Sequence, residues 1–594
     1  MLVAALAKRG SAKIFTTTQI IITNLHSTMK ILLKYSSIIL ILCTTSALRA
    51  TQPSLADLDQ YLKKSISWKS PALNRDIPLK IYFQGTPNEL EEPEVIVYLK
   101  NKAWERIGQE ADLTILTDYI QKRFIVITVD YGNDPKAISP YFDKDLSEIF
   151  RGVFGFKTES LLKDLNFKPR EYRCFFLPEG YRVATDLVYW ELDKHAAFGT
   201  LEFIMKSYNE DIVTKVPGLK TVTSPKDMVD RKGKPFDFTV KMDIVYPSQP
   251  KKKLPIIIHS ETLSQRNPNE RPHNYSPHFA GFLTRGYAYA VMAHCFNPCV
   301  NHYFHFGKFT LDHWNGFACY TAAIRFLHAN ADKYNLDPNH IGMIGYSKGE
   351  YAITRLSDPN HAGGAESQKY AGFPEGSPEP QPWPGYPSKI SAGMQGMGMG
   401  LFETEYITAD YVPNILICGE NDREVITEAH PVFVKRLEEL GTNHISLFMQ
   451  GQGHELPYGY DERMGVDRYQ LVHDFFDRYV RVEAKLPPVV LVVSPYNNRE
   501  DVSPSSEISV QFAPVVDETS ILEKNAVKVI RAKDNKEING SWKVSHGGTK
   551  FTFQPSQSLL NNEQYKVLVT TRVKDKRGTK LEKEKTVVFK VAVK

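Results

Sequence analysis

The chain has 594 residues, of which 24% are charged and 42% are hydrophobic, and its formal net charge is +5 at pH 7. At roughly 150 residues per domain, this length leaves room for three or four domains with sizeable cores. The composition disfavours a disordered, collagen-like or coiled-coil protein, and so small a charge excess gives no reason to expect a nucleic-acid partner. The six cysteines are too few for a dense disulfide framework.

A short apolar run near the N-terminus has the pattern of a secretory signal. Residues 35–47 are mostly apolar, follow two lysines and end in small side chains, and the apolar part is too short to span a bilayer comfortably. A buried strand is the alternative, but no segment close downstream would pair with it. We predict that residues 1–50 are a signal segment cleaved near Ala47 or Ala50, so that the protein is secreted or periplasmic. No later segment of the sequence is long and apolar enough for a membrane span.

Alternating strand and helix patterns follow in residues 51–235. A strand, a second strand, a helix-like stretch and a third strand are expected in turn at residues 77–83, 95–99, 113–120 and 124–129. This alternation predicts a parallel α/β layer. The same order returns in residues 238–246, 254–258, 278–284 and 287–292. The two passages therefore suggest a degenerate repeat, in which residues 51–235 are a half-repeat or a cap.

The second passage continues through residues 236–483 into a helix and a buried strand. Apolar side chains three or four residues apart predict a helix over residues 313–334. The sequence Asp-Pro-Asn-His then breaks this helix before the apolar strand at residues 341–344. Further on, residues 373–388 contain so many prolines that we expect a surface loop.

The character of the sequence changes after two consecutive prolines at positions 487 and 488. Short segments with alternating apolar residues follow, such as residues 508–512, 551–553 and 565–569, and turn residues separate them. Regular short strands with period two predict an antiparallel β-sandwich over residues 487–594.

A Gly345-x-Ser347-x-Gly349 motif comes directly after the apolar strand at residues 341–344. A serine in such a motif sits on a tight turn between a strand and a helix, where the glycines avoid steric collision and leave its Oγ exposed. Residues 351–356 are competent to form the helix that must follow. Because the motif also occurs by chance around ordinary turn serines, the assignment depends on partners elsewhere in the chain.

An acid and a histidine follow in the chain order that a serine triad requires. Residues 412–418 have a buried-strand pattern that is followed by Asp422, and residues 445–448 have another that is followed by His454. Both side chains are therefore expected just past the carboxyl ends of parallel strands, the edge where an open α/β sheet places its active site. If these residues have no catalytic role, Asp422 is an ordinary turn aspartate and His454 is a surface histidine.

With these residues, the chain from about residue 236 to residue 482 resembles the α/β-hydrolases, close in style to serine esterases of the dienelactone-hydrolase, acetyl-xylan-esterase and prolyl-oligopeptidase groups. The resemblance implies a mostly parallel sheet with flanking helices. It also implies that Ser347 is the nucleophile, that His454 is the general base and then the acid, and that Asp422 orients the imidazole. Glu420 is a poorer acid candidate, because the family usually places the carboxylate three residues after the glycine. The N-terminal passage has no Gly-x-Ser-x-Gly motif, so a half-repeat there would be catalytically silent.

The same resemblance implies an oxyanion hole. One donor is the backbone N–H of Lys348, and the second is an N–H of the loop that follows the strand ending in His259. Where the family often has His-Gly-Gly, this loop has Ser260 and Glu261 after the histidine, and one of these two is expected to supply the donor. Glu350 is a second departure, because a small residue is usual there, and it either shapes the site or points to solvent.

The C-terminal region resembles the bacterial Ig-like domains of secreted and surface-layer proteins. The similar stretches are Pro-Val-Val-Leu-Val-Val-Ser-Pro from Pro488, Asp501-Val-Ser-Pro, residues 508–514 and Phe551-Thr-Phe-Gln-Pro. The resemblance implies a spacer or a binding module that contacts glycan or the cell surface.

Two further groups of residues are candidates for binding. Trp383 in the proline-rich loop and Met394 after it suit an acyl or sugar pocket, as do Met397 and Met399, with ordinary packing as the alternative for each. Two cysteines and two histidines lie within residues 295–305, at Cys295, Cys299, His302 and His305. A structural metal, a Cys295–Cys299 disulfide and packing of a loop over the site are the alternatives for this segment.

Together these patterns predict a serine hydrolase that cleaves carboxylic esters through an acyl-enzyme, with an ester on a polysaccharide as the favoured substrate. No cofactor and no metal at the active site are implied. One alternative is a serine peptidase of prolyl-oligopeptidase type, although no propeller repeat is recognisable. The other is a non-catalytic surface binding protein on a hydrolase scaffold, against which the presence of Ser347, Asp422 and His454 argues.

Overall fold

The computed structural model describes most of the chain from residue 58 onward. The described residues are 58–90, 93–101, 113–132, 134, 142–154, 161–165, 167, 174–191, 205, 208–213, 218, 220–229, 235, 238–248, 252–260, 278–293, 311–359, 383, 385–397, 404, 407–423, 427–449, 451–454, 460–461, 466–522 and 526–593. The expected signal segment, the cysteine and histidine segment at residues 295–305, Glu261 and most of the proline-rich loop lie outside them. None of the described helices combines the length and the apolar character needed to cross a membrane.

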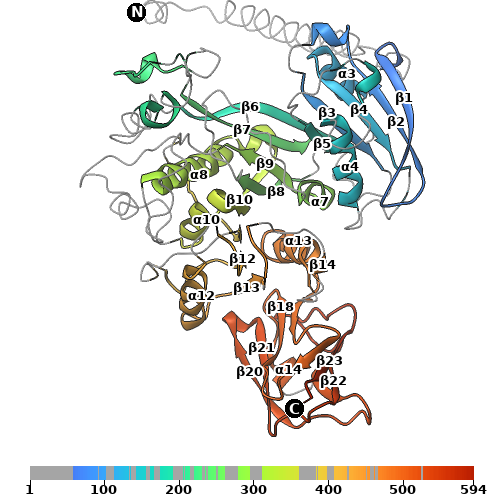
Figure 1. Ribbon diagram of the computed structural model, residues 1–594, viewed down its shortest axis with the longest axis vertical. Helices are drawn as coiled ribbons and strands as arrows, with labels where there is room; N and C mark the ends of the chain where they lie inside the picture. Colours follow the sequence, from blue (N-terminus) through green and yellow to red (C-terminus); the bar gives the residue numbers. More distant parts are fainter. Residues whose placement is uncertain are drawn as a thin grey trace, which may run out of the picture.

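The N-terminal region forms a five-stranded mixed sheet in the order β1-β2-β4-β3-β5 (Figure 1). Its strands are β1 (Leu62–Lys69), β2 (Asp76–Tyr82), β3 (Val95–Lys100), β4 (Ile125–Asp130) and β5 (Cys174–Pro178), and its helices are α3 (Leu113–Gln121) and α4 (Phe142–Phe154). The strands β3, β4 and β5 run parallel to one another, and β2 and β1 are added antiparallel. Continuous apolar runs bury both faces of β3 and β4, as is typical of parallel strands covered by helices.

The central region forms an eight-stranded sheet in the order β13-β12-β11-β10-β8-β9-β7-β6 (Figure 1). Its strands are β6 (Tyr181–Glu191), β7 (Thr239–Pro247), β8 (Leu254–Ser260), β9 (Ala288–Met292), β10 (Leu336–Tyr346), β11 (Ala392–Gly396), β12 (Asn414–Gly419) and β13 (His444–Met449). Only β7, which pairs with β9 and β6, introduces antiparallel pairs. The prediction of a mostly parallel sheet is confirmed.

Helices cover both faces of the central sheet. They are α7 (His278–Thr284), α8 (Leu311–Ala329), α9 (Ala331–Tyr334), α10 (Tyr351–Leu356), α12 (Ala429–Glu439) and α13 (Arg468–Tyr479), with a small hairpin of β14 (Tyr460–Asp461) and β15 (Val466–Asp467) before α13. Ile257 packs on the side of α7 and α13, whereas Ile256 and Ile258 pack on the side of α8 and α10. This alternation follows from the period of two along a strand. The helix expected over residues 313–334 is two helices, because Asn330 interrupts it.

The two sheets share one topology. Read from β5 and from β10, the orders β5-β3-β4-β2-β1 and β10-β8-β9-β7-β6 have the same sequence of parallel and antiparallel pairs. In both, a helix links the third strand of the passage to the fourth. Duplication of one five-stranded unit would produce this arrangement. The two copies differ after their last strand, because β10 leads into Ser347 whereas β5 leads through Glu179 and Gly180 directly into β6.

The C-terminal region is a sandwich of two four-stranded sheets, β16-β18-β21-β20 and β17-β23-β22-β19. The strands are β16 (Val489–Ser494), β17 (Arg499–Val502), β18 (Ile508–Ala513), β19 (Val527–Arg531), β20 (Gly540–Ser545), β21 (Lys550–Pro555), β22 (Gln564–Val569) and β23 (Lys585–Val591), and one short helix is α14 (Glu518–Leu522). Every pairing between these strands is antiparallel except β17 with β23. A separate apolar core fills the space between the two sheets.

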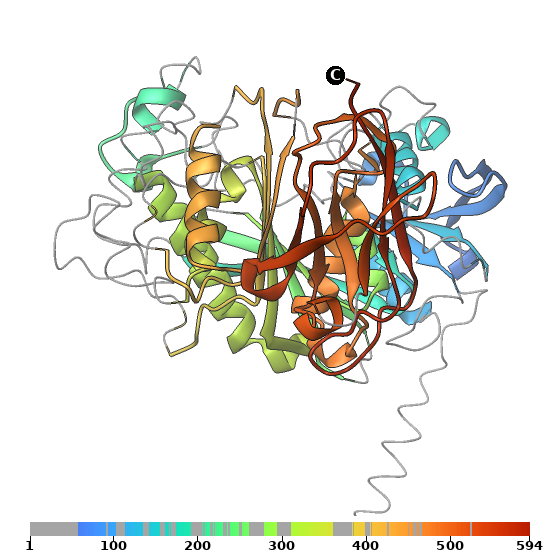
Figure 2. The same cartoon turned by 90° about the horizontal axis from the view of Figure 1, so that it is seen from below.

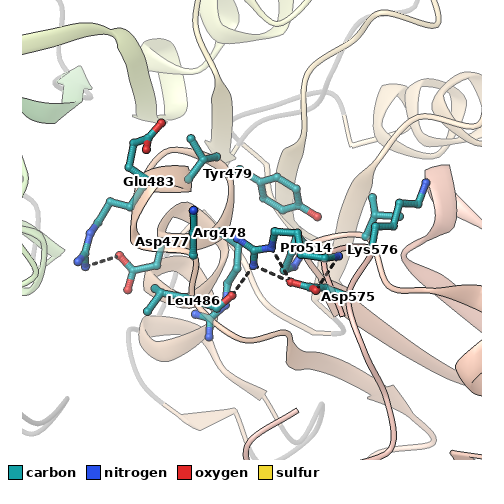
Figure 3. Close-up of a pocket in the computed structure, with 13 residues that line it drawn as sticks. Asp477, Arg478, Tyr479, Glu483, Leu486, Pro514, Asp575 and Lys576 are labelled. Atoms are coloured by element: carbon teal, nitrogen blue, oxygen red, sulfur yellow. Dashed lines mark hydrogen bonds and ion pairs between the residues drawn. The ribbon is translucent and has the colours of Figure 1, made fainter. Parts of the chain in front are cut away.

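The sandwich contacts the central region beside α13. Figure 2 looks from the sandwich end and shows the N-terminal sheet to one side. At the junction, the Arg577 guanidinium donates to Asp575 Oδ2 at 2.8 Å and to the carbonyl of Leu486 at 2.7 Å (Figure 3). These residues, together with Asp477 on α13 and Pro514, border a pocket of about 430 Å³. The pocket is not lined by Ser347, Asp422 or His454.

Buried histidines make the stability of the central region depend on pH. His430 on α12 is 3% exposed and its Nε2 lies 3.0 Å from Ser446 Oγ. Burial lowers the pKa of His430 from 6.5 to about 4. The unfolded chain therefore binds more protons between pH 6.5 and pH 4, and stability falls as the pH drops through that window, by at most about 1.4 kcal/mol per pH unit for one histidine.

We expect His430→Gln to reduce this acid sensitivity, because glutamine can still bond to Ser446 but does not titrate. The measurement is the urea midpoint of wild type and variant at pH 7 and pH 5. A smaller loss on acidification is expected for the variant, and equal losses would contradict the assignment.

Candidate active site

Ser347 lies on the sharp turn between β10 and α10. It opens a 3₁₀ turn (Ser347–Gly349) with a φ of +52°, in the left-handed region that non-glycine residues seldom adopt. Such strained backbone is concentrated at functional sites, and here it turns the serine out of the strand direction. The hydroxyl of Tyr320 on α8 donates to the carbonyl of Gly349 at 2.5 Å and holds the turn. The local sequence gives no sign of this contact, because Tyr320 and Gly349 lie 29 residues apart in the chain.

Gly345 is required at this turn because the backbone folds back on it. A Cβ at Gly345 would lie 2.2 Å from the carbonyl oxygen of Gly349. We expect Gly345→Ala to displace the turn and to reduce activity by roughly 10²-fold, the cost of misplacing a reacting group by about 1 Å. The matched control is Gly453→Ala, where a Cβ would meet only Asn421 O at 3.9 Å. Steady-state rates on one ester, with circular dichroism as a folding check, test the pair, and equal rates for both variants would contradict the prediction.

The structure brings together the three side chains that the sequence proposed as a triad. His454 Nε2 lies 3.0 Å from Ser347 Oγ, and His454 Nδ1 lies 3.0 Å and 2.8 Å from the two carboxylate oxygens of Asp422. The Asp422 side chain is fully buried, whereas that of His454 is 28% exposed. Because a carboxylate only accepts hydrogen bonds, Nδ1 carries the hydrogen and the Nε2 lone pair faces the serine hydroxyl.

Neighbouring parallel strands place Asp422 and His454 at the same sheet edge. Asp422 follows β12 and His454 follows β13, and the two strands pair in register. Close packing of the two loops depends on Gly419, where a Cβ would lie 2.3 Å from the carbonyl oxygen of Gly453. Glu420, the second acid candidate, has another task, because its Oε2 accepts from the backbone N–H of Gly451 at 2.8 Å.

Glu350 is fully buried behind the turn. Of the two alternatives for Glu350, the one in which it points to solvent is therefore wrong. Its Oε2 lies 3.4 Å from Thr354 Oγ1, and that hydroxyl donates to Gln395 Oε1 on β11 at 2.7 Å. Glu350 thus belongs to a polar network that links α10 to the adjacent strand.

The structure describes the backbone of two of the three residues expected to form the oxyanion hole. The backbone of Lys348 lies in the 3₁₀ turn after the serine. Ser260 ends β8 and pairs in register with Gly345 on β10, so its backbone is on the strand next to the turn. Glu261 lies outside the described residues. His259, one residue earlier, is 3% exposed between the rings of Tyr289 and Tyr346, and burial lowers its pKa to about 3.

Of the residues proposed for a substrate pocket, Met394 is buried, Trp383 and Met397 are partly buried against the core, and Met399 lies outside the described residues. Met394 is 2% exposed in the middle of β11, a central strand that the small residues Ala-Gly-Met-Gln-Gly concealed in the sequence. The indole N–H of Trp383 donates to the carbonyl of Tyr189 at 2.8 Å, and its ring packs edge-on against Phe326. The packing alternative therefore accounts for Met394 and Trp383.

Comparisons with known proteins identify two segments of the chain. Residues 484–591 match the bacterial Ig-like domain family, and residues 242–353 match the BD-FAE family, an esterase-like hydrolase domain. The second match includes Ser347 and ends before Asp422 and His454. No curated protein matches the chain.

Solved structures with a similar fold include esterases. A truncated carbohydrate esterase from gut microbiota is 15% identical, with 43% of this chain and 94% of that chain covered and a TM-score of 0.30. An acetyl ester-xyloside bifunctional hydrolase from Caldicellulosiruptor lactoaceticus is 14% identical, with 52% and 96% covered and a TM-score of 0.29. An S-layer protein is 22% identical over 21% of this chain and 16% of that chain, with a TM-score of 0.16.

The predicted combination of an α/β-hydrolase and an Ig-like sandwich is confirmed. The chain contains an esterase-like hydrolase domain followed by a bacterial Ig-like domain. From here on, the central region is called the hydrolase domain and the sandwich is called the Ig-like domain.

Proposed function

We propose that the protein is a secreted serine esterase in which Ser347, His454 and Asp422 form the catalytic triad. The observation that carries this proposal is the continuous set of contacts from Ser347 Oγ through both nitrogens of His454 to the buried carboxylate of Asp422. In a serine triad, the serine is the nucleophile, the histidine is the general base and then the acid, and the aspartate orients the histidine.

In the first half of the reaction, Ser347 Oγ attacks the ester carbonyl while its proton passes to His454 Nε2. The imidazolium that forms is stabilised by the negative charge of Asp422, which keeps the ring oriented. The negative charge on the substrate oxygen is stabilised by the backbone N–H of Lys348 and by a second N–H at the end of β8, for which Ser260 and Glu261 are the candidates. His454 then gives its proton to the departing alcohol, which leaves an acyl group on Ser347.

In the second half, water takes the place of the alcohol. His454 Nε2 accepts a proton from the water molecule while the water oxygen attacks the acyl carbonyl. The bond to Ser347 Oγ breaks, the proton returns to the serine, and the free acid leaves.

For the substrate, we propose an acyl group on a polysaccharide, such as acetyl or an aromatic acid. The support for this is the Ig-like domain, a module expected to contact glycan or a cell surface, together with the signal-like N-terminal segment. These two features also support a secreted or periplasmic location.

A fluorophosphonate tests the mechanism because it labels activated serines. We expect label on Ser347, located by mass spectrometry, and none on Ser347→Ala or on denatured wild type. Folded wild-type protein that takes no label would overturn the proposal and favour a binding protein on a hydrolase scaffold.

A substrate panel tests the bond and the substrate class. Acetylated xylan, feruloylated oligosaccharides, 4-nitrophenyl acetate and peptide anilides are compared at equal concentration. Release of acid from the acylated glycans is expected. Turnover of the anilides alone would favour a peptidase and contradict the esterase assignment.

A further inference from the structure

Three possible metal ligands meet where the hydrolase domain contacts the Ig-like domain. They are Glu438 near the end of α12, His444 at the start of β13, and His546 in the 3₁₀ turn (His546–Gly548) between β20 and β21. One side-chain nitrogen or oxygen from each lies within 4.8 Å of the other two. Two ligands thus come from the hydrolase domain and one from the Ig-like domain.

Backbone carbonyls fix which nitrogen of each histidine is available. His444 Nδ1 lies 3.2 Å from the carbonyl of Thr442, and His546 Nδ1 lies 3.1 Å from the carbonyl of His444. A carbonyl only accepts hydrogen bonds, so each Nδ1 carries the hydrogen and each Nε2 presents a lone pair. Metal-binding histidines are commonly oriented by this kind of bond from the opposite ring nitrogen.

The Nε2 atoms of His444 and His546 are available as metal ligands. His444 is fully buried, and its Nε2 has no hydrogen-bond partner within the described part of the chain. His546 Nε2 lies 3.6 Å from Glu438 Oε1, too far for a direct hydrogen bond. The two rings stack with centroids 4.1 Å apart. A buried nitrogen lone pair without a donor costs free energy, and a cation bound to it would remove that cost.

We propose that Glu438, His444 and His546 bind a divalent transition-metal ion, with Zn²⁺ as the best match, and that the ion joins the Ig-like domain to the hydrolase domain. Two imidazoles and one carboxylate are a ligand set that borderline ions such as Zn²⁺ favour, whereas Mg²⁺ and Ca²⁺ prefer oxygen ligands throughout. The Glu438 side chain is 51% exposed, which gives the ion a path from solvent.

The competing arrangement is a proton on His546 Nε2 that pairs with Glu438 without any metal. The site shares no residue with the triad, because His444 begins β13 whereas His454 follows its far end.

Metal titration of the full chain without its signal segment distinguishes these arrangements. The protein is stripped with a chelator and titrated with Zn²⁺ by calorimetry and with Co²⁺ by absorption. We expect one ion per chain, at least tenfold weaker binding by Glu438→Gln and by His546→Gln, and a thermal midpoint that Zn²⁺ raises in wild type more than in either variant. The matched control is Glu439→Gln, because Glu439 is the next residue on α12 and pairs instead with Lys435 and Arg436.

Three results would overturn the proposal. They are no binding by folded wild type, binding that both variants retain, and a Co²⁺ spectrum with intense thiolate charge-transfer bands, which would place the ion on cysteines such as Cys295 and Cys299. Circular dichroism and ester hydrolysis verify that the variants fold. Glu438→Gln changes an exposed side chain, so the test stands even if His546→Gln does not fold.

Discussion

Replacing Ser347 with alanine is expected to reduce kcat/KM for an ester by roughly 10⁴-fold to 10⁶-fold, to a residual rate that depends only on binding and the oxyanion donors. The loss is large because the variant lacks the hydroxyl that lies 3.0 Å from His454 Nε2 and that would attack the substrate. Alanine removes only the hydroxyl. The φ of +52° at this position remains a strained one for alanine, so the variant is compared with wild type by thermal unfolding as well as by rate.

The control for this variant is a serine outside the site. Ser391, just before β11, has its Oγ 3.4 Å from the carbonyl of Asn339, and Ser391→Ala should keep the wild-type rate. If Ser347→Ala retained more than about a hundredth of the activity, the proposed attack by Ser347 would be contradicted, because loss of the nucleophile of a serine triad lowers kcat by far more than this.

Replacing Asp422 with asparagine is expected to reduce kcat by about 10⁴-fold with little change in KM. The asparagine amide can donate to His454 Nδ1, which the carboxylate cannot. The ring would then carry its hydrogen on Nε2, which faces Ser347 and could no longer accept the serine proton. The buried site also loses the charge that stabilises the imidazolium.

Glu420→Gln is the matched control for Asp422→Asn. Glu420 lies two residues earlier on the same loop, and the amide oxygen of glutamine can still accept from the N–H of Gly451. We expect less than about a tenfold change in kcat for this variant, since only the bond that holds the loop is weakened. A large loss in Glu420→Gln and a small one in Asp422→Asn would show that the acid of the triad is Glu420.

Local sequence patterns were sufficient to predict most helices and strands near the active site. The helix at residues 278–284 and the strands that end before Ser347, Asp422 and His454 all carry strong apolar patterns, and all are present. The structure also brings these three side chains within hydrogen-bond distance of one another, because parallel strands of one sheet bring their carboxyl ends to the same edge.

Other features have no local signal. The strand β11 was concealed because glycine and alanine have low strand propensity, and it is stable only because β10 and β12 pair with it on both sides. Burial of Glu350, Met394 and part of Trp383 likewise depends on neighbours that the local sequence does not reveal.

Local sequence patterns were enough to predict most strands and helices of the hydrolase domain, the turn at Ser347 and the resemblance of the two domains that follow the N-terminal sheet. They could do so because periodicity, glycine spacing and short motifs are properties of contiguous residues. The strand pairing, the burial of individual side chains and the stacking of His444 on His546, 102 residues apart, follow only from the three-dimensional packing. Such contacts depend on the packing of whole elements, and an apolar pattern records that a face is covered but not what covers it.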